Sequence, residues 1–463
     1  MKLKRLWQPE TLNMMTHYFI SQDIFHHCEI YRRACDDWHT TEQQIATLRQ
    51  QQADFAVANI TQRTKALSAF AERLSLNAET IANAICQEVG RCLPECRAEV
   101  QKSLALIQYY VHLAPELLAR KTVTTTASLS QIAFEPLGLV LAVMPWNYPV
   151  WQVLRFAVPA LCAGNACLVK PAPTVGRVTE MLFDLVGDDL PLQAAFLSHD
   201  DIEQAIANTD ALAFTGSAKT GRHLAQIAGK YLKKCVLELG GSNAFIVFKD
   251  ADIQAAAKDA CHSRFRDAGQ SCNAAKRIIL VPEIADDFMS EFLRHCKQLQ
   301  SGDPSQPETT LACLHLDNAP QHLQALVDDA IACGAKLLLG GVLPETPHSY
   351  PATVLDCVPL SAKVASEEVF GTVAAVFRAD NAENAIDIAN HSPFGLGACI
   401  YSADTNAAWR LGQKLNVGSV FINRHTSSDL RLPFGGVKSS GFGRELSEFG
   451  LYEFVNIKSY WQK

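Results

Sequence analysis

The stretch that decides the interpretation of this chain is Phe265-Arg266-Asp267-Ala268-Gly269-Gln270-Ser271-Cys272, in which a cysteine follows a short turn that contains glycine. Upstream, Glu238 stands beside the glycine pair Gly240-Gly241, and Pro145-Trp146-Asn147 follows an apolar run. A nucleophile, a base and an amide donor are the three parts that acyl chemistry on a thiol requires. The sequence therefore predicts an enzyme that works through a covalent cysteine intermediate.

The composition is that of a globular protein with more than one domain. The chain has 463 residues, of which 48% are hydrophobic and 19% are charged. Because the net charge is −7, we expect neither nucleic acid nor an anionic membrane as a partner. The 15 cysteines contain no CxxC pair, which is typical of reduced thiols and predicts a cytoplasmic protein.

Metal-binding and targeting signals are weak in this sequence. His26, His27 and Cys28 are adjacent, and three neighbouring side chains cannot easily face one ion, so we expect a surface loop and no metal site. The basic segment Met1–Trp7 is not followed by an apolar region, so a signal peptide is not expected. No run of 18 apolar residues predicts a membrane span.

Apolar patterning predicts an α/β fold. Residues 40–120 have mainly helical periodicity, and the threonine-rich Thr122–Ser128 with Ile132–Phe134 predicts a β-ribbon. Short apolar runs separated by helical stretches then indicate βαβ units and a parallel sheet. The predicted strands are Leu139–Met144, Ala166–Val169, Ala195–Leu197, Ala211–Phe214, Val236–Leu237, Ala244–Val247, Ile278–Val281, Lys336–Leu339 and Val373–Phe377, with a helix over Ile284–Gln298 and an edge strand over Leu451–Tyr460.

The motifs, taken in this order along the chain, resemble the aldehyde dehydrogenase superfamily. The resemblance implies a Rossmann-type dinucleotide-binding domain over residues 1–121 and 136–239, and an α/β catalytic domain over 240–446. It also implies a small β oligomerisation ribbon from 122–135 and 447–463. A two-stranded ribbon is marginal alone, so we expect pairing across the subunits of a homodimer or homotetramer.

The resemblance assigns three catalytic residues. Cys272 fills the position of the family's nucleophile, and a thiolate adds readily to an aldehyde carbonyl. Glu238 fills the position of the general base that activates water against the thioester; its apolar neighbours predict a raised pKa. Asn147 fills the position of the oxyanion donor, which it shares with the backbone N–H of Cys272.

The cofactor residues also follow from the resemblance, since the chain has no Gly-x-Gly-x-x-Gly motif. Pro173 stands where members that prefer NAD commonly have a glutamate that binds the ribose. A proline does not repel a 2′-phosphate, so we expect both NAD and NADP as cofactors. The implied cofactor-binding residues are Trp146, Lys170, Pro173, Gly216, Ser217, Gly221, Glu368 and Phe370.

Within the superfamily, the sequence is most similar to the succinate-semialdehyde dehydrogenases. Arg155 and Arg266 stand where that subgroup places arginines for the substrate carboxylate, and a guanidinium fork suits a carboxylate. The alternative for each arginine is a structural ion pair. The second cysteine of a disulfide switch is replaced by Ala274. Further implied substrate residues are Ser427 or Ser428, and Trp151, Phe265 and Phe434 as the walls of a tunnel.

The leading prediction is an NAD(P)-dependent dehydrogenase that oxidises an aldehyde, succinate semialdehyde by this resemblance, and hydrolyses the thioester. One alternative is an enzyme that transfers the acyl group to CoA or phosphate, against which the water-activating Glu238 argues. Another is a dehydrogenase for glutarate semialdehyde or a different aldehyde, since the same arginines would serve a longer chain. A third is a catalytically inactive member that serves as a binding protein.

Overall fold

The computed structural model describes residues 18–463, so the basic segment 1–7 and the signal-peptide prediction lie outside the described residues. The described chain begins with a hairpin of β1 (Tyr18–Asp23) and β2 (Cys28–Ala34). His26, His27 and Cys28 are exposed at its turn. Across residues 18–463, no group of three His, Cys, Asp or Glu side chains could hold a metal ion, and no helix is long and apolar enough to cross a membrane.

Four helices follow the hairpin, as the periodicity of residues 40–120 predicts. Their ends are fixed by local chemistry: the Asp37 side chain caps the first helix, a capping box joins Asn59 to Gln62, and Gly90 ends the third helix in the left-handed conformation. The apolar faces of the second, third and fourth helices pack into one core with the strands that follow, whereas the first helix packs through Ile45 and Leu48 into a separate cluster. The helices are α1 (Trp38–Val57), α2 (Ile60–Leu76), α3 (Ala78–Val89) and α4 (Leu93–Leu117).

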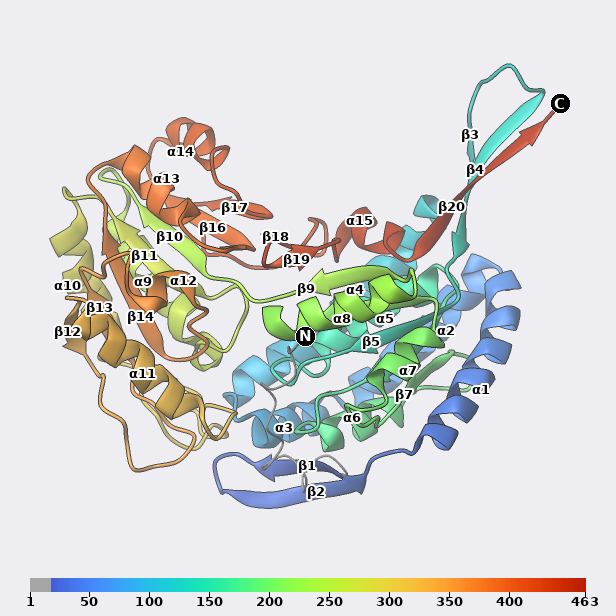
Figure 1. Ribbon diagram of the computed structural model, residues 1–463, viewed down its shortest axis with the longest axis horizontal. Helices are drawn as coiled ribbons and strands as arrows, with labels where there is room; N and C mark the ends of the chain where they lie inside the picture. Colours follow the sequence, from blue (N-terminus) through green and yellow to red (C-terminus); the bar gives the residue numbers. More distant parts are fainter. Residues whose placement is uncertain (1–17) are drawn as a thin grey trace, which may run out of the picture.

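The first large sheet has the strand order β19-β9-β8-β5-β6-β7, and the order of its five parallel strands runs outward in two directions from β5 and β8 (Figure 1). In an open sheet of this kind, ligands bind outside the carboxyl ends of the strands where the order reverses. Its strands are β5 (Leu139–Val143), β6 (Ala166–Lys170), β7 (Leu192–Ala194), β8 (Ala211–Thr215), β9 (Lys234–Glu238) and β19 (Gly441–Phe442), with α5 (Trp151–Cys162), α6 (Gly176–Phe183), α7 (Ile202–Ala207) and α8 (Ala218–Lys230).

One predicted strand of this sheet is misplaced. The sheet contains Leu192–Ala194, whereas Ala195–Leu197 lies just beyond it. The backbone N–H of Phe196 donates to the Asp36 carboxylate, and Leu197 forms a bridge with the Asp36 backbone. The apolar run therefore pairs with the N-terminal segment, a contact between residues far apart in the sequence that local patterning does not reveal.

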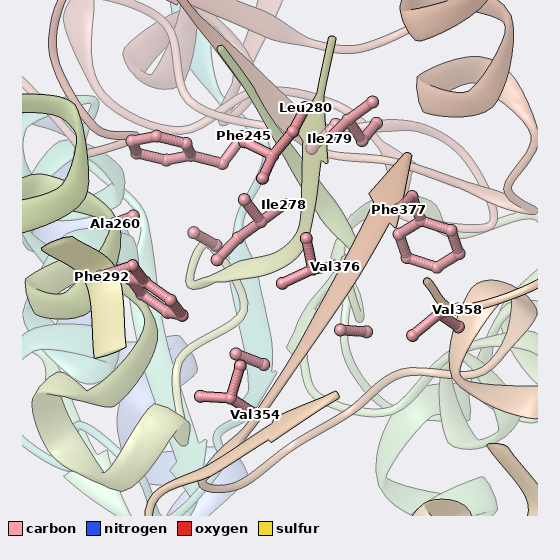
Figure 2. Packing of buried hydrophobic residues seen from close by; sticks show 14 of the residues in the cluster. Phe245, Ala260, Ile278, Ile279, Leu280, Phe292, Val354, Val358, Val376 and Phe377 are labelled. Carbon is pink, nitrogen blue, oxygen red and sulfur yellow. The ribbon is translucent and has the colours of Figure 1, made fainter. Parts of the chain in front are cut away.

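The second large sheet has the order β12-β13-β14-β11-β10-β16-β17 and is parallel except at β12. Its central strands are buried on both faces, and Ile278, Val354 and Val376 pack against Phe292 of a covering helix (Figure 2). Its strands are β10 (Asn243–Val247), β11 (Ala275–Leu280), β12 (Lys336–Leu339), β13 (Thr353–Asp356), β14 (Val373–Arg378), β16 (Gly397–Tyr401) and β17 (Ser419–Ile422). Its helices are α9 (Ile253–Phe265), α10 (Ala285–Cys296), α11 (Ala319–Ala332), α12 (Lys363–Ser366), α13 (Ala382–Asn390) and α14 (Thr405–Gly412); β15 (Phe394–Gly395) pairs with β18 (Val437–Lys438) beside it.

The chain crosses between the two sheets from β9 to β10 and returns through β19 (Figure 1). The prediction assigns residues 240–446 to the catalytic unit, yet β19 pairs with β9 of the first sheet. This return requires a glycine, because a Cβ at Gly441 would lie 1.9 Å from the carbonyl oxygen of Leu237. The division into two domains at residue 239 stays a prediction.

A three-stranded sheet projects from the body of the molecule (Figure 1). It contains β3 (Lys121–Thr122), β4 (Leu129–Pro136) and the edge strand β20 (Val455–Gln462), which follows α15 (Ser447–Tyr452). The two ribbon segments pair with each other inside one chain, and the predicted pairing of this ribbon across subunits stays a prediction. Most of Thr122–Ser128 is a turn and not a strand, because Thr125 hydroxyl contacts to Ser130 and Ala127 close it.

Candidate active site

A cavity of about 250 Å³ contains the thiol of Cys272 in its wall. It lies among the N-terminal half of α4, the start of α5, the end of α9 and the irregular segment after β17. The predicted residues that line it are Cys272, Arg155, Arg266, Ser427, Ser428, Trp151 and Phe434. Lys102, Glu99, Tyr148, His262 and His425 also line it, although the sequence analysis did not single them out.

Backbone geometry presents Cys272 to this cavity. After α9 the chain makes a short turn in which Asp267 and Ala268 have left-handed φ values of 54° and 53°. Such conformations cost free energy for residues other than glycine and occur mostly where surrounding contacts impose them. Burial raises the pKa of the Cys272 thiol to about 11, although Arg155 and Lys276 act in the opposite direction.

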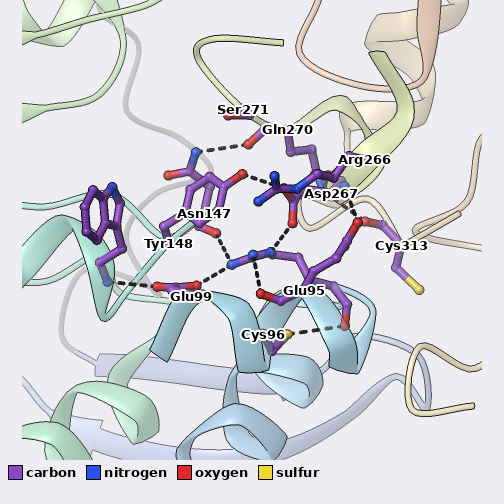
Figure 3. A network of polar contacts seen from close by, with 12 residues as sticks. Glu95, Cys96, Glu99, Asn147, Tyr148, Arg266, Asp267, Gln270, Ser271 and Cys313 are labelled. Atoms are coloured by element: carbon purple, nitrogen blue, oxygen red, sulfur yellow. Dashed lines mark hydrogen bonds and ion pairs between the residues drawn. The ribbon is translucent and has the colours of Figure 1, made fainter. Parts of the chain in front are cut away.

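The turn is held by a buried polar network that includes Asp267, Glu99 and Tyr148 (Figure 3). Arg91 is at its centre. The Arg91 guanidinium donates to Asp267 Oδ1 at 2.6 Å and to Glu99. Glu99 Oε1 accepts the backbone N–H groups of Val150 and Trp151, each at 2.9 Å. The network therefore connects the nucleophile turn to the segment that contains Asn147.

Asn147 lies beside the nucleophile loop. Its Nδ2 donates one hydrogen bond of 3.0 Å to the carbonyl oxygen of Gln270, two residues before Cys272 (Figure 3). An amide nitrogen has two hydrogens, so a second donor is available for an oxyanion. The geometry fits the predicted oxyanion role, which stays a prediction.

Glu238 ends β9 and is 3% exposed. Neither of its carboxylate oxygens has a hydrogen-bond partner within the described chain. Burial, and then the nearby Glu445, raise its pKa well above the ordinary value, against the opposing effects of Arg155 and Arg444. A carboxyl group in this setting has the basicity that a water-activating base requires, as the sequence analysis expects.

Arg155 lines the cavity, but its charge is compensated by a residue that the sequence analysis missed. Its Nε lies 2.5 Å from Oε2 of Glu445, without the angle of a hydrogen bond, and both side chains are buried. The guanidinium also lies 5.0 Å from the ring centre of Phe434. Arg155 therefore makes the structural ion pair that the sequence left as one alternative, and its substrate-binding role stays a prediction.

The other predicted substrate residues divide into two groups. Arg266 is partly exposed, and its Nε lies 3.1 Å from Asp267 Oδ2. Ser427 accepts a hydrogen bond from Arg424, while Ser428 accepts one from Lys102. Phe265, in contrast, does not line the cavity: it is 1% exposed and packs in the core of the second sheet with Phe292. Its predicted place in a tunnel wall is wrong, because α9 turns this position toward the sheet.

The predicted cofactor residues gather at the carboxyl ends of β5, β6 and β8. Ser217 caps α8, and a Cβ at Gly216 or Gly221 would meet Phe214 or Leu239 at 2.5 Å or less. The resulting bare turn at a helix N-terminus suits a pyrophosphate. Lys170 ends β6 at 3% exposure, its Nζ donates to the Pro171 carbonyl at 3.1 Å, and burial lowers its pKa to about 8. Pro173 follows it, with its carbonyl accepting from Ile20.

Two further predicted cofactor residues, Glu368 and Phe370, lie between α12 and β14 of the second sheet unit. Glu368 accepts from the Lys276 ammonium and from the backbone N–H of Gly241. The Phe370 ring lies edge-on to Trp146 at 5.9 Å, and Trp146 stacks on His315 at 4.1 Å. A half-buried acceptor and an aromatic cluster between the two sheets fit a nicotinamide ribose and ring, so the residues present are compatible with the dinucleotide.

The comparisons with known proteins match this geometry. The model of the aldehyde dehydrogenase family matches residues 26–460. The chain belongs to the aldehyde dehydrogenase family. The family match confirms the predicted superfamily and the prediction of an aldehyde-oxidising enzyme. The chain is 40% identical to the succinate semialdehyde dehydrogenase [NAD(P)+] Sad of Escherichia coli over 416 residues, which cover 88% of this chain and 90% of the relative.

Other relatives extend the same likeness. A succinate-semialdehyde dehydrogenase [NADP(+)] of Deinococcus radiodurans is 40% identical over 86% of this chain and 85% of its own. Among solved structures, the succinic semialdehyde dehydrogenase of Streptococcus pyogenes in complex with NADP+ is similar with a TM-score of 0.92 and 30% identity, covering 95% of this chain and 99% of that one. These likenesses confirm the predicted aldehyde dehydrogenase fold.

Proposed function

We propose that this protein oxidises succinate semialdehyde to succinate with NAD(P)+. The observation that carries the proposal is the position of Cys272 in the wall of a cavity that three cationic side chains also line, namely Lys102, Arg155 and Arg266. A cationic cavity beside an aldehyde-reactive thiol suits an aldehyde whose far end is a carboxylate. The curated relatives at 40% identity are named for the same substrate.

The reaction uses Cys272, Asn147 and Glu238 in turn. The Cys272 thiolate forms a bond to the aldehyde carbon, and Asn147 Nδ2 with the backbone N–H of Cys272 stabilises the oxyanion. A nicotinamide cofactor, held beside Glu368, Phe370 and Trp146, would supply the acceptor for a hydride from that carbon, and the loss of hydride would leave a thioester on Cys272. Glu238 then takes a proton from water, whose oxygen attacks the thioester carbon; the carbon–sulfur bond breaks, and the acid is released.

The cofactor class agrees with the names of the relatives, which include both NAD(P)+ and NADP(+), and this confirms the predicted use of a nicotinamide dinucleotide. Lys170 and Pro173 support the finer proposal that both NAD and NADP are used. Lys170 has two further N–H groups for ribose hydroxyls or a 2′-phosphate, and Pro173 contributes no carboxylate to repel that phosphate.

We also propose an oligomeric assembly and a cellular location for this protein. The projecting sheet leaves one edge of β20 without a strand partner in the described chain, and Trp461 and Ile457 on it are exposed. Such an edge suits burial against another subunit, so we propose a homodimer or homotetramer. We also retain the proposal of a cytoplasmic protein, on the ground of the 15 scattered cysteines.

A product assay tests this function. The full-length protein is mixed with succinate semialdehyde and either NAD+ or NADP+, and succinate and the reduced cofactor are quantified. We expect one succinate per reduced cofactor without CoA or phosphate, and rates with the two cofactors within about tenfold, or 1.4 kcal/mol. Glutarate semialdehyde in parallel identifies a preference for the longer chain. No reduced cofactor with any aldehyde would show the inactive binding member instead.

A further inference from the structure

Lys102 differs from the other cations that line the cavity of Cys272 in having no carboxylate partner. Arg155 is paired with Glu445, and Arg266 with Asp267. No ion pair involves Lys102 within residues 18–463, and its Nζ contacts the hydroxyl oxygen of Ser428. Its positive charge is therefore the least compensated of the three and is the one most available to a ligand.

The surroundings of Lys102 shield it partly from bulk water without neutralising it. The ammonium lies 4.3 Å from the ring centre of Trp151, on the wall shared with Cys272. Burial, then Arg155 and Arg266, lower the pKa of Lys102 to about 8, while Cys272 and Asp429 act in the opposite direction. Asp429 is itself paired with Arg431. An isolated ammonium in such a place is costly unless an anion occupies the site for part of the catalytic cycle.

The Ser428 hydroxyl makes Lys102 part of a two-point site. The hydroxyl oxygen accepts from Lys102, so its own hydrogen is free to point elsewhere. An ammonium and a hydroxyl side by side present two donors, which match the two oxygens of a carboxylate. Ser428 comes from the segment after β17 and Lys102 from α4, so the two donors meet only in the folded chain.

We propose that Lys102, together with Ser428, binds the carboxylate at the far end of the aldehyde substrate and is a specificity-determining residue. The inference rests on the proposed function and names a residue of that same site. The reaction at Cys272 does not require Lys102, so its effect is on the selection of charged aldehydes over uncharged ones. A competing explanation is that Lys102 only holds the Ser428 segment in place.

Substrate pairs of equal length separate the two explanations. KM and kcat are measured for succinate semialdehyde and for butanal, both with four carbons, in wild type and in Lys102→Met, which keeps an unbranched side chain one atom shorter and removes its charge. We expect KM for succinate semialdehyde to rise at least about tenfold, KM for butanal to change less than about twofold, and kcat to stay within about twofold. The matched control Lys297→Met changes an exposed lysine at the end of α10 and leaves both KM values unaltered.

Two additional measurements keep the proposal falsifiable. Lys102→Arg retains a cation and restores most of the selectivity, and the inhibition constant of succinate against butanal oxidation rises in Lys102→Met and less strongly in Ser428→Ala. Equal losses for the charged and uncharged aldehydes, or an unchanged inhibition constant for succinate, would overturn the role of Lys102. A wild-type protein that oxidises butanal as well as succinate semialdehyde would overturn the proposed function itself, a different outcome that the same experiment shows.

Discussion

The Tyr148 hydroxyl donates a hydrogen bond of 2.5 Å to Asp267 Oδ2, and this contact ties the residue after Asn147 to the turn that precedes Cys272. Arg91 occupies the other oxygen of the same carboxylate. Burial alone would raise the pKa of Asp267, but Arg91 and Arg266 outweigh it, and the pKa lies below its ordinary value. The two catalytic loops therefore depend on one ionised, buried carboxylate.

Removing either partner of Asp267 should weaken the fold and catalysis together. Tyr148→Phe removes a hydrogen bond to a charged group, at a cost of about 1.5–3 kcal/mol in the free energy of unfolding. Arg91→Met leaves buried Glu99 without its cation and Asp267 with Arg266 as its remaining cation, which costs about 3–5 kcal/mol. We expect kcat to fall about tenfold in Tyr148→Phe, because Asn147 is held less firmly. Urea unfolding and steady-state kinetics measure both effects.

The control for this prediction is Tyr350→Phe, which removes a hydroxyl that donates to Gln324 in the second sheet unit, far along the chain from either catalytic loop. It should cost about 0.5–1.5 kcal/mol of stability and leave kcat unchanged. A Tyr148→Phe variant that behaves like this control would show that the Asp267 contact does not position the catalytic loops.

The raised pKa of Cys272 predicts slow alkylation at neutral pH. Since only the thiolate reacts with iodoacetamide and the pKa is about 11, the rate at Cys272 should rise about tenfold per pH unit between pH 7 and 10. Mass spectrometry of the peptide with Cys272 follows the reaction, and exposed Cys28 in the same sample reports on the reagent. A rate that levels off by pH 8 would mean a thiol more acidic than burial allows.

Cys272→Ala should abolish aldehyde oxidation and retain cofactor binding.

Glu238→Gln should separate the two halves of the reaction. Hydride transfer does not need this carboxylate, but hydrolysis of the thioester does, so we expect a burst of reduced cofactor followed by a slow steady state. Stopped-flow absorbance at the reduced nicotinamide band measures the burst, with an amplitude near one per active site. Full steady-state turnover without a burst would place the base on another residue.

Arg155 can be tested apart from its partner. Arg155→Leu removes a cation from the cavity and leaves buried Glu445 without a counterion, so we expect a loss of about 3–5 kcal/mol in stability together with a larger rise in KM for succinate semialdehyde than for an uncharged aldehyde. The double variant Arg155→Leu/Glu445→Leu should recover stability while the KM effect persists. If the double variant also recovers KM, Arg155 is structural and the carboxylate is bound by other residues.

The strands and helices were predictable wherever burial is continuous along the sequence. The runs Leu139–Met144 and Val373–Phe377 are buried on both faces, and their apolar composition reports that directly. The prediction failed where individual polar contacts, and not the apolar pattern, decide the local structure. Asp36 takes the N–H of Phe196, and short-range hydroxyl contacts fold most of Thr122–Ser128 into a turn. Neither contact leaves a periodic signal.

The candidate catalytic residues can be picked out of the sequence because their neighbours form motifs, as the glycines around Glu238 and Cys272 do. The residues that complete the site have no such neighbours. Lys102 sits in an ordinary helical stretch, and Glu445 follows a glycine-rich loop whose pairing with Arg155 depends on the return of the chain through β19. Their roles follow from three-dimensional proximity between segments hundreds of residues apart.

The preference for a carboxylate at the far end of the aldehyde is the central claim, and the ratio of kcat/KM for succinate semialdehyde to that for butanal tests it most directly. Both aldehydes have four carbons and differ in the terminal group, so the ratio isolates recognition of the charge in the cavity of Cys272. One charge-assisted contact of about 2 kcal/mol predicts a ratio of about 30 or more for the wild-type protein at neutral pH. A ratio near one would contradict the account.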